Sequence, residues 1–171
     1  MRIQFGIFVG ASLDGFIARE DGGLDWLKPF EGEEHGYAGF MSSIDALVIG
    51  RGTYDTVLAF PEWPYAGKRV VVCTRRPAEA AHGEEFWSGS PRALAEKLDG
   101  EGVKRVYLDG GALISSFLRE GLVDELTVSV VPIILGGGLP LFSGEMPQLS
   151  LRLLGAKSFP SGLVQLRYRR G

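Results

Sequence analysis

The sequence predicts an α/β protein built on one mostly parallel sheet, with an antiparallel C-terminal edge and helices on both faces. Apolar runs typical of buried strands alternate with segments of helical periodicity along most of the chain. The chain then finishes with two consecutive strand-like segments, which pair antiparallel when no helix separates them. No linker divides the 171 residues, so we expect residues 1–171 to form a single domain.

The first half of the chain begins with a strand over residues 2–10. Ile3, Phe5 and Ile7 alternate there, and Phe8 adds an apolar side chain on the second face, which indicates a strand buried on both sides. A long turn-rich loop follows, and such loops in compact domains are often functional. The other elements expected in this half are a helix over 33–43, a strand over 45–50, a helix over 53–59 and a strand over 68–74.

The second half contains two helices with recognisable ends. Ser90 and Pro91 supply an N-cap and a first-turn proline for one of them. The apolar stripe from Leu113 to Leu118 marks the other, which Gly121 ends. The strands expected in this half cover 84–87, 103–109, 124–132, 149–158 and 163–170.

Charge and cysteine content exclude several classes of function. Lys and Arg total 18 against 21 for Asp and Glu, a net charge of −3 that gives no basic footprint for nucleic acid or an anionic membrane. No apolar run approaches the ~20 residues of a membrane-spanning helix, and residues 1–10 do not fit a secretory signal. One cysteine and two histidines make a disulfide or a structural zinc site unexpected. The sequence therefore predicts a cytoplasmic protein without a bound metal.

A candidate anion site lies where the strand over 45–50 runs into Gly50-Arg51-Gly52-Thr53. Free backbone N–H groups at a helix start, the Arg51 guanidinium and the Thr53 hydroxyl all suit a phosphate group. The alternative is an ordinary strand-to-helix turn with Thr53 as its N-cap.

The same pattern recurs at Asp109-Gly110-Gly111-Ala112, again between a strand and a helix. Adjacent glycines let the backbone pass closely beneath a pyrophosphate, although a tight turn with close helix packing explains them equally well. Ligands of α/β sheets bind beyond the carboxyl ends of the strands, where both motifs fall. Two such sites in one sheet favour a dinucleotide more strongly than either site alone.

A third strand end carries Thr74 and Arg75. A hydroxyl and a guanidinium there suit the 2′-phosphate that distinguishes NADP from NAD. By itself, however, this segment is better explained as a solvated basic turn.

Two carboxylates and two aromatic side chains are candidates for contact with a substrate. Asp14 lies in an Asp-Gly pair that is either simple turn chemistry or a polar group at the mouth of the first strand. Glu34, near the start of a helix, is a possible proton or substrate handle. Trp26 and Tyr37 either wall a pocket or anchor the loop and core. The sequence shows no Ser/His/Asp signature, so a hydrolase is not predicted.

Taken in order, these motifs resemble the dihydrofolate reductase-like superfamily, and most closely the reductase domain of riboflavin biosynthesis and its stand-alone relatives. The segments that carry the resemblance are SLDGFIA, DWL, DALVIGRGTYD, VVVCTRRP and, most specifically, residues 106–142. The resemblance implies a central mixed sheet, NADPH as cofactor and hydride transfer to a small pterin- or pyrimidine-type heterocycle. It also implies a homodimer, and the apolar segment LPLF after Gly136–Gly138 favours self-association.

The resemblance assigns cofactor-binding roles to three groups of residues. Those expected to contact the nicotinamide are Ala11, Ile17 and Ala18. Those expected at the phosphate groups and the adenosine 2′-phosphate are Gly50, Arg51, Thr53, Thr74, Arg75, Gly110, Gly111 and Ala112.

The expected substrate lies between the 12–27 loop and the helix near Glu34. Asp14 and Glu34 would hold or protonate it, and Trp26 and Tyr37 would wall the pocket. Glu34 falls near the acidic position of dihydrofolate reductases, but the residues that follow it do not rebuild a folate pocket. The function hypothesis is therefore an NADPH-dependent reductase of a small heterocycle; the alternatives are an NADPH-binding module without turnover and a true dihydrofolate reductase.

Overall fold

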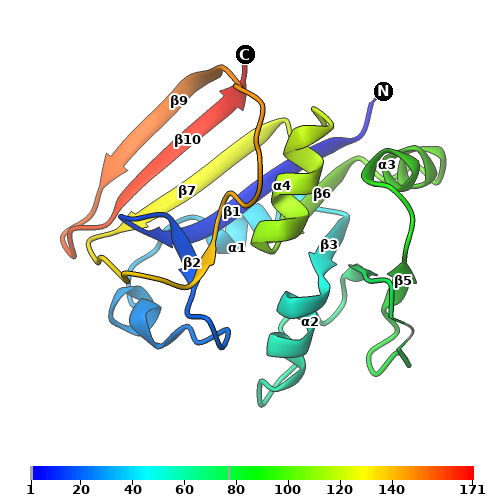
Figure 1. Ribbon diagram of the computed structural model, residues 1–171, viewed down its shortest axis with the longest axis horizontal. Helices are drawn as coiled ribbons and strands as arrows, with labels where there is room; N and C mark the ends of the chain where they lie inside the picture. The colour runs from blue at the N-terminus through cyan, green and yellow to red at the C-terminus, as the bar shows by residue number, and fades with distance from the viewer. Residues whose placement is uncertain (1, 77) are drawn as a thin grey trace.

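The computed structural model describes residues 2–76 and 78–171, and an eight-stranded sheet runs through the whole molecule (Figure 1). Its strands, in the order in which they lie side by side, are β5 (Glu85–Trp87), β4 (Arg69–Cys73), β3 (Ala46–Gly50), β6 (Arg105–Asp109), β1 (Gln4–Ser12), β7 (Glu125–Val131), β10 (Val164–Arg170) and β9 (Leu151–Ser158). A separate two-stranded sheet pairs β2 (Phe16–Ala18) with β8 (Leu139–Pro140). The helices are α1 (Tyr37–Ser43), α2 (Arg51–Leu58), α3 (Pro91–Gly100) and α4 (Gly111–Arg119).

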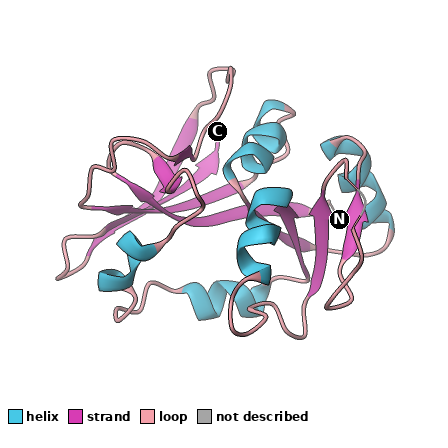
Figure 2. Ribbon diagram, turned by 60° about the horizontal axis from the view of Figure 1, so that its bottom comes forward, coloured by secondary structure: helices cyan, strands magenta, loops and turns pink. Residues whose placement is uncertain are grey.

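Strand direction in the large sheet follows the predicted pattern. The strands from β5 to β7 pair in parallel, whereas β10 pairs antiparallel with both β7 and β9. Figure 2 shows helices on both faces of the sheet. The predicted fold class, a mostly parallel mixed sheet with an antiparallel C-terminal edge, is confirmed.

The helices cover the sheet because its central strands are apolar on both faces. On one face α3 and α4 pack over β1 and β6, and the rings of Phe5 and Phe117 lie 5.1 Å apart in that layer. On the other face α1 and α2 cover β3 and β4, with Tyr54 of α2 buried against this layer. The two layers hold the parallel strands together and leave their carboxyl ends free for a site.

Three local elements differ from the sequence prediction. The helix expected over 33–43 begins only at Tyr37, because Gly36 adopts a left-handed conformation (φ +86°) and its N–H donates to the Glu34 carboxylate at 2.6 Å. The helix expected over 53–59 already begins at Arg51, with Gly50 as its N-cap. The expected loop after β1 contains β2 and a 3-10 helix over Asp25–Phe30. Helix ends are set by single-residue backbone conformations, which apolar periodicity does not report.

Candidate active site

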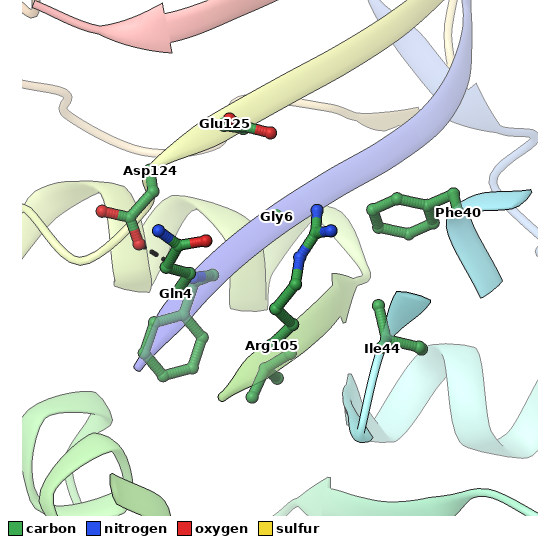
Figure 3. Close-up of a pocket in the computed structure, with 9 residues that line it drawn as sticks. Gln4, Gly6, Phe40, Ile44, Arg105, Asp124 and Glu125 are labelled. Atoms are coloured by element: carbon green, nitrogen blue, oxygen red, sulfur yellow. Dashed lines mark hydrogen bonds between the residues drawn. The ribbon is translucent and has the colours of Figure 1, made fainter. Parts of the chain in front are cut away.

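A cleft of about 450 Å³ opens at the carboxyl ends of β1, β3 and β6. The starts of α2 and α4 form one side of it, and the two-stranded sheet of β2 and β8 contributes Ile17, Ala18 and Leu139. A second hollow lies at the opposite edge, where Gln4, Gly6, Phe40 and Arg105 surround only about 10 Å³ (Figure 3). That space admits no more than a water molecule, so the large cleft is the candidate site.

Two helices begin at the cleft without side-chain caps. The N-cap residues Gly50 and Gly110 carry no side chain, and the first-turn N–H groups of α2 and α4 therefore lack the usual capping partner. Both helix starts line the cleft, together with Thr53 and Ala112. Uncapped N–H groups and two helix dipoles at one surface form a binding site for anions such as a pyrophosphate.

The glycine pair allows these helix starts to lie so close together. Gly110 has a φ of +109°, and a Cβ there would lie 2.9 Å from the Thr53 hydroxyl. A Cβ on Gly111 would overlap the backbone carbonyl oxygen of Pro140 in β8. The close helix packing that the sequence offered as one explanation is present, and it brings the backbone to the surface of the cleft. Contact of this backbone with a pyrophosphate stays a prediction.

Arg51 connects the start of α2 to the loop after β4. Its Nε donates to Asp55 at 2.9 Å, and its terminal nitrogen donates to the Arg76 carbonyl at 3.1 Å and the Thr74 hydroxyl at 3.4 Å. Thr74 thus lies beside Arg51, although it is not part of the cleft lining, and Arg75 is exposed on the same loop. The guanidinium remains one-quarter exposed and lines the cleft. These residues and the two helix starts fit the phosphate groups of a dinucleotide cofactor.

Ile17 and Ala18 line the cleft as expected for residues beside a nicotinamide, but Ala11 does not. Ala11 is 3% exposed and faces the core layer beneath α4. Its neighbours Val9 and Gly10 on β1 line the cleft in its place.

The Asp14 carboxylate was expected beside the substrate, but it lies outside the cleft. It accepts hydrogen bonds from the Ser12 hydroxyl at 2.6 Å and from the N–H groups of Leu135 and Gly136 at 3.1 and 2.8 Å. The bond from Ser12, followed by those from the two amides, lowers the pKa of Asp14. Asp14 therefore ties the turn after β1 to the glycine-rich loop after β7 and does not line the cleft.

Glu34 and Trp26 also lie away from the cleft lining. The exposed Glu34 carboxylate accepts a hydrogen bond from the Gly36 N–H in the turn before α1. Trp26 is 4% exposed and packs against Val131 and Leu163 in a small core cluster of its own. Tyr37 alone of the four substrate candidates lines the cleft. The alternative interpretation, loop and core anchoring, fits Trp26.

Among the described residues that line the cleft, the one carboxylic acid is Asp109, at the carboxyl end of β6. Burial raises the pKa of its carboxyl to about 6. The hydroxyls of Tyr65 and Tyr107 lie near it: burial raises the pKa of both, and the charge of Asp109 raises them further. Tyr107 also donates to the Phe8 carbonyl at 2.9 Å. A carboxyl that titrates near neutrality inside a cleft is suited to hold or transfer a proton.

The sequence carried a signal for Asp109 but none for Tyr65. Asp109 directly precedes the glycine pair, and the two-residue period of a strand places it on the same face as Tyr107. Tyr65 comes from the irregular segment between α2 and β4, whose path no local pattern predicts.

Comparison with known proteins identifies the family to which the chain belongs. The family model of the RibD C-terminal domain matches residues 6–165. The chain belongs to this family. The uncharacterized protein YwjB of Bacillus subtilis is 38% identical over 169 residues, with 96% of both chains covered.

Two solved structures extend this comparison of the RibD C-terminal domain. A protein from Shewanella sp. PV-4 whose name assigns it to riboflavin biosynthesis is 34% identical, with a TM-score of 0.91 and 99% of each chain covered. The deaminase and 5-amino-6-(5-phosphoribosylamino)uracil reductase of Thermotoga maritima shares the fold at 17% identity, with a TM-score of 0.76. The match covers 99% of this chain but 57% of that bifunctional protein.

The described residues of this RibD C-terminal domain show neither a metal-binding cluster nor a membrane-spanning helix. They contain no cluster of three or more His, Cys, Asp or Glu side chains placed to hold a metal ion. Within the same ranges, no helix has the length and apolar character needed to cross a bilayer.

The contact between the glycine pair and β8 gives a stability prediction. Gly111→Ala forces the start of α4 away from the Pro140 carbonyl, so we expect a loss of about 1–3 kcal/mol in the free energy of unfolding. Gly100→Ala in α3 is the matched control, because no atom lies within 4 Å of its Cβ position and alanine favours helices. Urea denaturation measures both variants. Equal stability of the two would contradict the tight contact.

Proposed function

We propose that this protein is an NADPH-dependent reductase of a small nitrogen heterocycle. The observation that carries the proposal is one cleft with two uncapped helix starts and Arg51 at one end and the Asp109 carboxyl beside them. The name of the Thermotoga maritima relative, a 5-amino-6-(5-phosphoribosylamino)uracil reductase, supports a reductase with a pyrimidine-type substrate. NADPH, when bound, supplies the hydride, and the protein supplies binding, orientation and electrostatics.

The phosphate end of the cleft would hold the cofactor. The N–H groups at the starts of α2 and α4 and the Arg51 guanidinium would contact the pyrophosphate. Thr74 and Arg75, on the loop beside Arg51, would contact the adenosine 2′-phosphate. Ile17 and Ala18 would lie against the nicotinamide and keep water from it.

Asp109 is our candidate for the acid in place of Asp14 and Glu34. Reduction of a ring C=N bond adds hydride at carbon and requires a proton at nitrogen. A carboxyl with a pKa of about 6 keeps a protonated fraction near neutrality and forms a hydrogen bond with a ring nitrogen in either state. We expect turnover to fall as the pH rises through about 6, because the proton donor is then lost.

The Arg51 guanidinium gives the first test of cofactor binding. Arg51→Ala should weaken NADPH binding by about 1.5–3 kcal/mol, the contribution of a charge-assisted hydrogen bond, as measured by isothermal titration calorimetry. Arg75→Ala should weaken NADPH more than NADH. Arg92→Ala, on the distant helix α3, serves as the control. Unchanged NADPH affinity of the Arg51 variant would remove this residue from the site.

Turnover separates the proposal from its alternative, a binding module without chemistry. NADPH oxidation is followed with a panel of reducible pteridines, pyrimidines and folates. Steady oxidation with any heterocycle supports the reductase, and preference for dihydrofolate would favour a dihydrofolate reductase. Tight NADPH binding without oxidation across the panel would favour the binding module.

Asp109 also gives a prediction that needs no substrate. Because the pKa of Asp109 in the folded protein, about 6, lies above the usual aspartate value of 3.8, the folded protein loses stability as the pH rises from about 4 through about 6. Asp109→Asn removes this loss. The comparison is the difference in free energy of unfolding between the variant and the wild type. This difference should shift in favour of the variant by on the order of 2–3 kcal/mol between about pH 4 and about pH 7.

Denaturant unfolding at the two pH values measures this difference for Asp109→Asn. The control is Glu96→Gln, which changes an exposed carboxyl on α3. A pH-independent effect of Asp109→Asn would mean that the Asp109 carboxyl titrates normally and is no candidate for the acid.

We propose further that two copies associate through the β9 edge of the sheet. β9 is the last strand of the sheet, and Leu151, Leu153 and Leu154 on it are 42%, 56% and 39% exposed. Antiparallel pairing of β9 with the β9 of a second copy would satisfy the outer backbone groups and bury these side chains in a two-fold interface. The LPLF segment, by contrast, is partly used inside the molecule, since β8 pairs with β2.

Light scattering at micromolar concentration tests this association. The wild type should be a dimer, and Leu153→Glu should yield a folded monomer because it places a charge in the interface. Phe142→Glu changes a side chain of the LPLF segment that is 50% exposed and should leave the dimer intact. A monomeric wild type, or a dimer lost only in the Phe142 variant, would contradict the β9 interface.

A further inference from the structure

The cleft contains very little formal charge. Among the described residues that line it, Arg51 is the single cation and Asp109 the single carboxylate. The Arg51 guanidinium lies at the start of α2, bound to Asp55 and to the loop after β4. Once the phosphate groups of the cofactor occupy that end, as the proposed function requires, no lining cation remains for a second phosphate.

The part of the cleft around Asp109 is built from aromatic and aliphatic side chains. Tyr37 and Tyr65 lie close enough to Asp109 for its charge to raise their pKa values, and Phe8 lines the cleft from β1. Leu27 and Phe60 add apolar surface elsewhere in the cleft. Such walls suit the flat faces of an aromatic ring. The Asp109 carboxylate has no cation among the causes that shift its pKa, and burial alone raises it. An anionic substrate group placed here would face this carboxylate in a poorly solvated space, which is unfavourable.

Two basic residues close to the cleft in the sequence, Arg19 and Lys68, are engaged elsewhere, and Lys28 is not among the residues that line the cleft. The Arg19 guanidinium forms two hydrogen bonds with the Asp25 carboxylate, at 2.7 and 3.1 Å. Lys68, which follows the loop that contributes Tyr65, donates to the Ile44 carbonyl at 2.9 Å. Moving either group to a substrate phosphate would break these bonds.

We propose that the substrate carries no phosphate and is a neutral or cationic, amino-substituted aromatic heterocycle. Its ring would stack on the aromatic walls, and its N–H groups would donate to Asp109 and the tyrosine hydroxyls. This inference rests on the proposed function and narrows it. It separates this chain from the Thermotoga maritima reductase, whose named substrate is a phosphoribosylamino uracil.

The test compares three probes by anaerobic isothermal titration calorimetry on the NADPH-loaded protein. The probes are 5-amino-6-(5-phosphoribosylamino)uracil, the same compound without its phosphate, and a diaminopteridine. We expect a phosphate-free probe to bind at least tenfold more tightly than the phosphorylated one. Tighter binding of the phosphorylated probe would overturn the proposal, as would binding of none of the three to a protein that binds NADPH. Failure to bind NADPH at all would instead overturn the proposed function.

A variant tests the charge argument directly. Asp109→Asn removes the carboxylate at almost constant volume. Diaminopteridine binding should weaken about tenfold, because its N–H groups lose a charged acceptor. Binding of the phosphorylated probe should strengthen, because the carboxylate no longer repels the phosphate. Glu96→Gln should change neither affinity. An equal loss of both affinities in the Asp109 variant would show a merely structural role and overturn the proposal.

Discussion

The cleft depends on one close approach, that of the first turn of α4 to the backbone of β8. Because Gly111 has no side chain, the Pro140 carbonyl lies where a Cβ would be, and β8 in turn holds β2 by antiparallel pairing. The two-stranded sheet is thereby fixed beside the carboxyl ends of β1 and β6. Ile17 and Ala18 of β2 line the cleft beside this contact, so the glycine pair helps to position both the helix start and the wall opposite it.

The same contact explains why the anion-binding end and the titratable group are adjacent. Asp109 is the last residue of β6, and the uncapped start of α4 follows it after a single glycine. The dipole of that helix and its free N–H groups favour negative charge, whereas burial disfavours the Asp109 carboxylate and raises its pKa to about 6. One short segment therefore contributes an uncapped helix start and a carboxyl with a raised pKa to the same cleft.

Fold class was predictable because it depends on patterns that extend over many residues. Alternating apolar runs identified the strands of the large sheet, and the two final strands without a helix between them predicted the antiparallel edge. The glycine-containing helix starts were also visible, since strand ends and glycines are local features. The positions of Asp14, Glu34 and Trp26 were not predictable in this way. A carboxylate in a turn accepts backbone N–H groups as readily as it binds a ligand, and only the folded path shows which partners are within reach.

Membership of the RibD C-terminal domain family and the chemistry of this cleft constrain different parts of the function. The glycine pair and the helix starts are backbone features, and they determine what can bind at the phosphate end. Substrate recognition instead depends on side chains from separate elements, such as Tyr37 of α1 and Tyr65 of the loop before β4. Such side chains can change without disturbing the backbone of the helix starts. Among the described residues, the cleft combines two uncapped helix starts with a single lining cation, and this combination is compatible with the proposed reductase of a substrate without a phosphate.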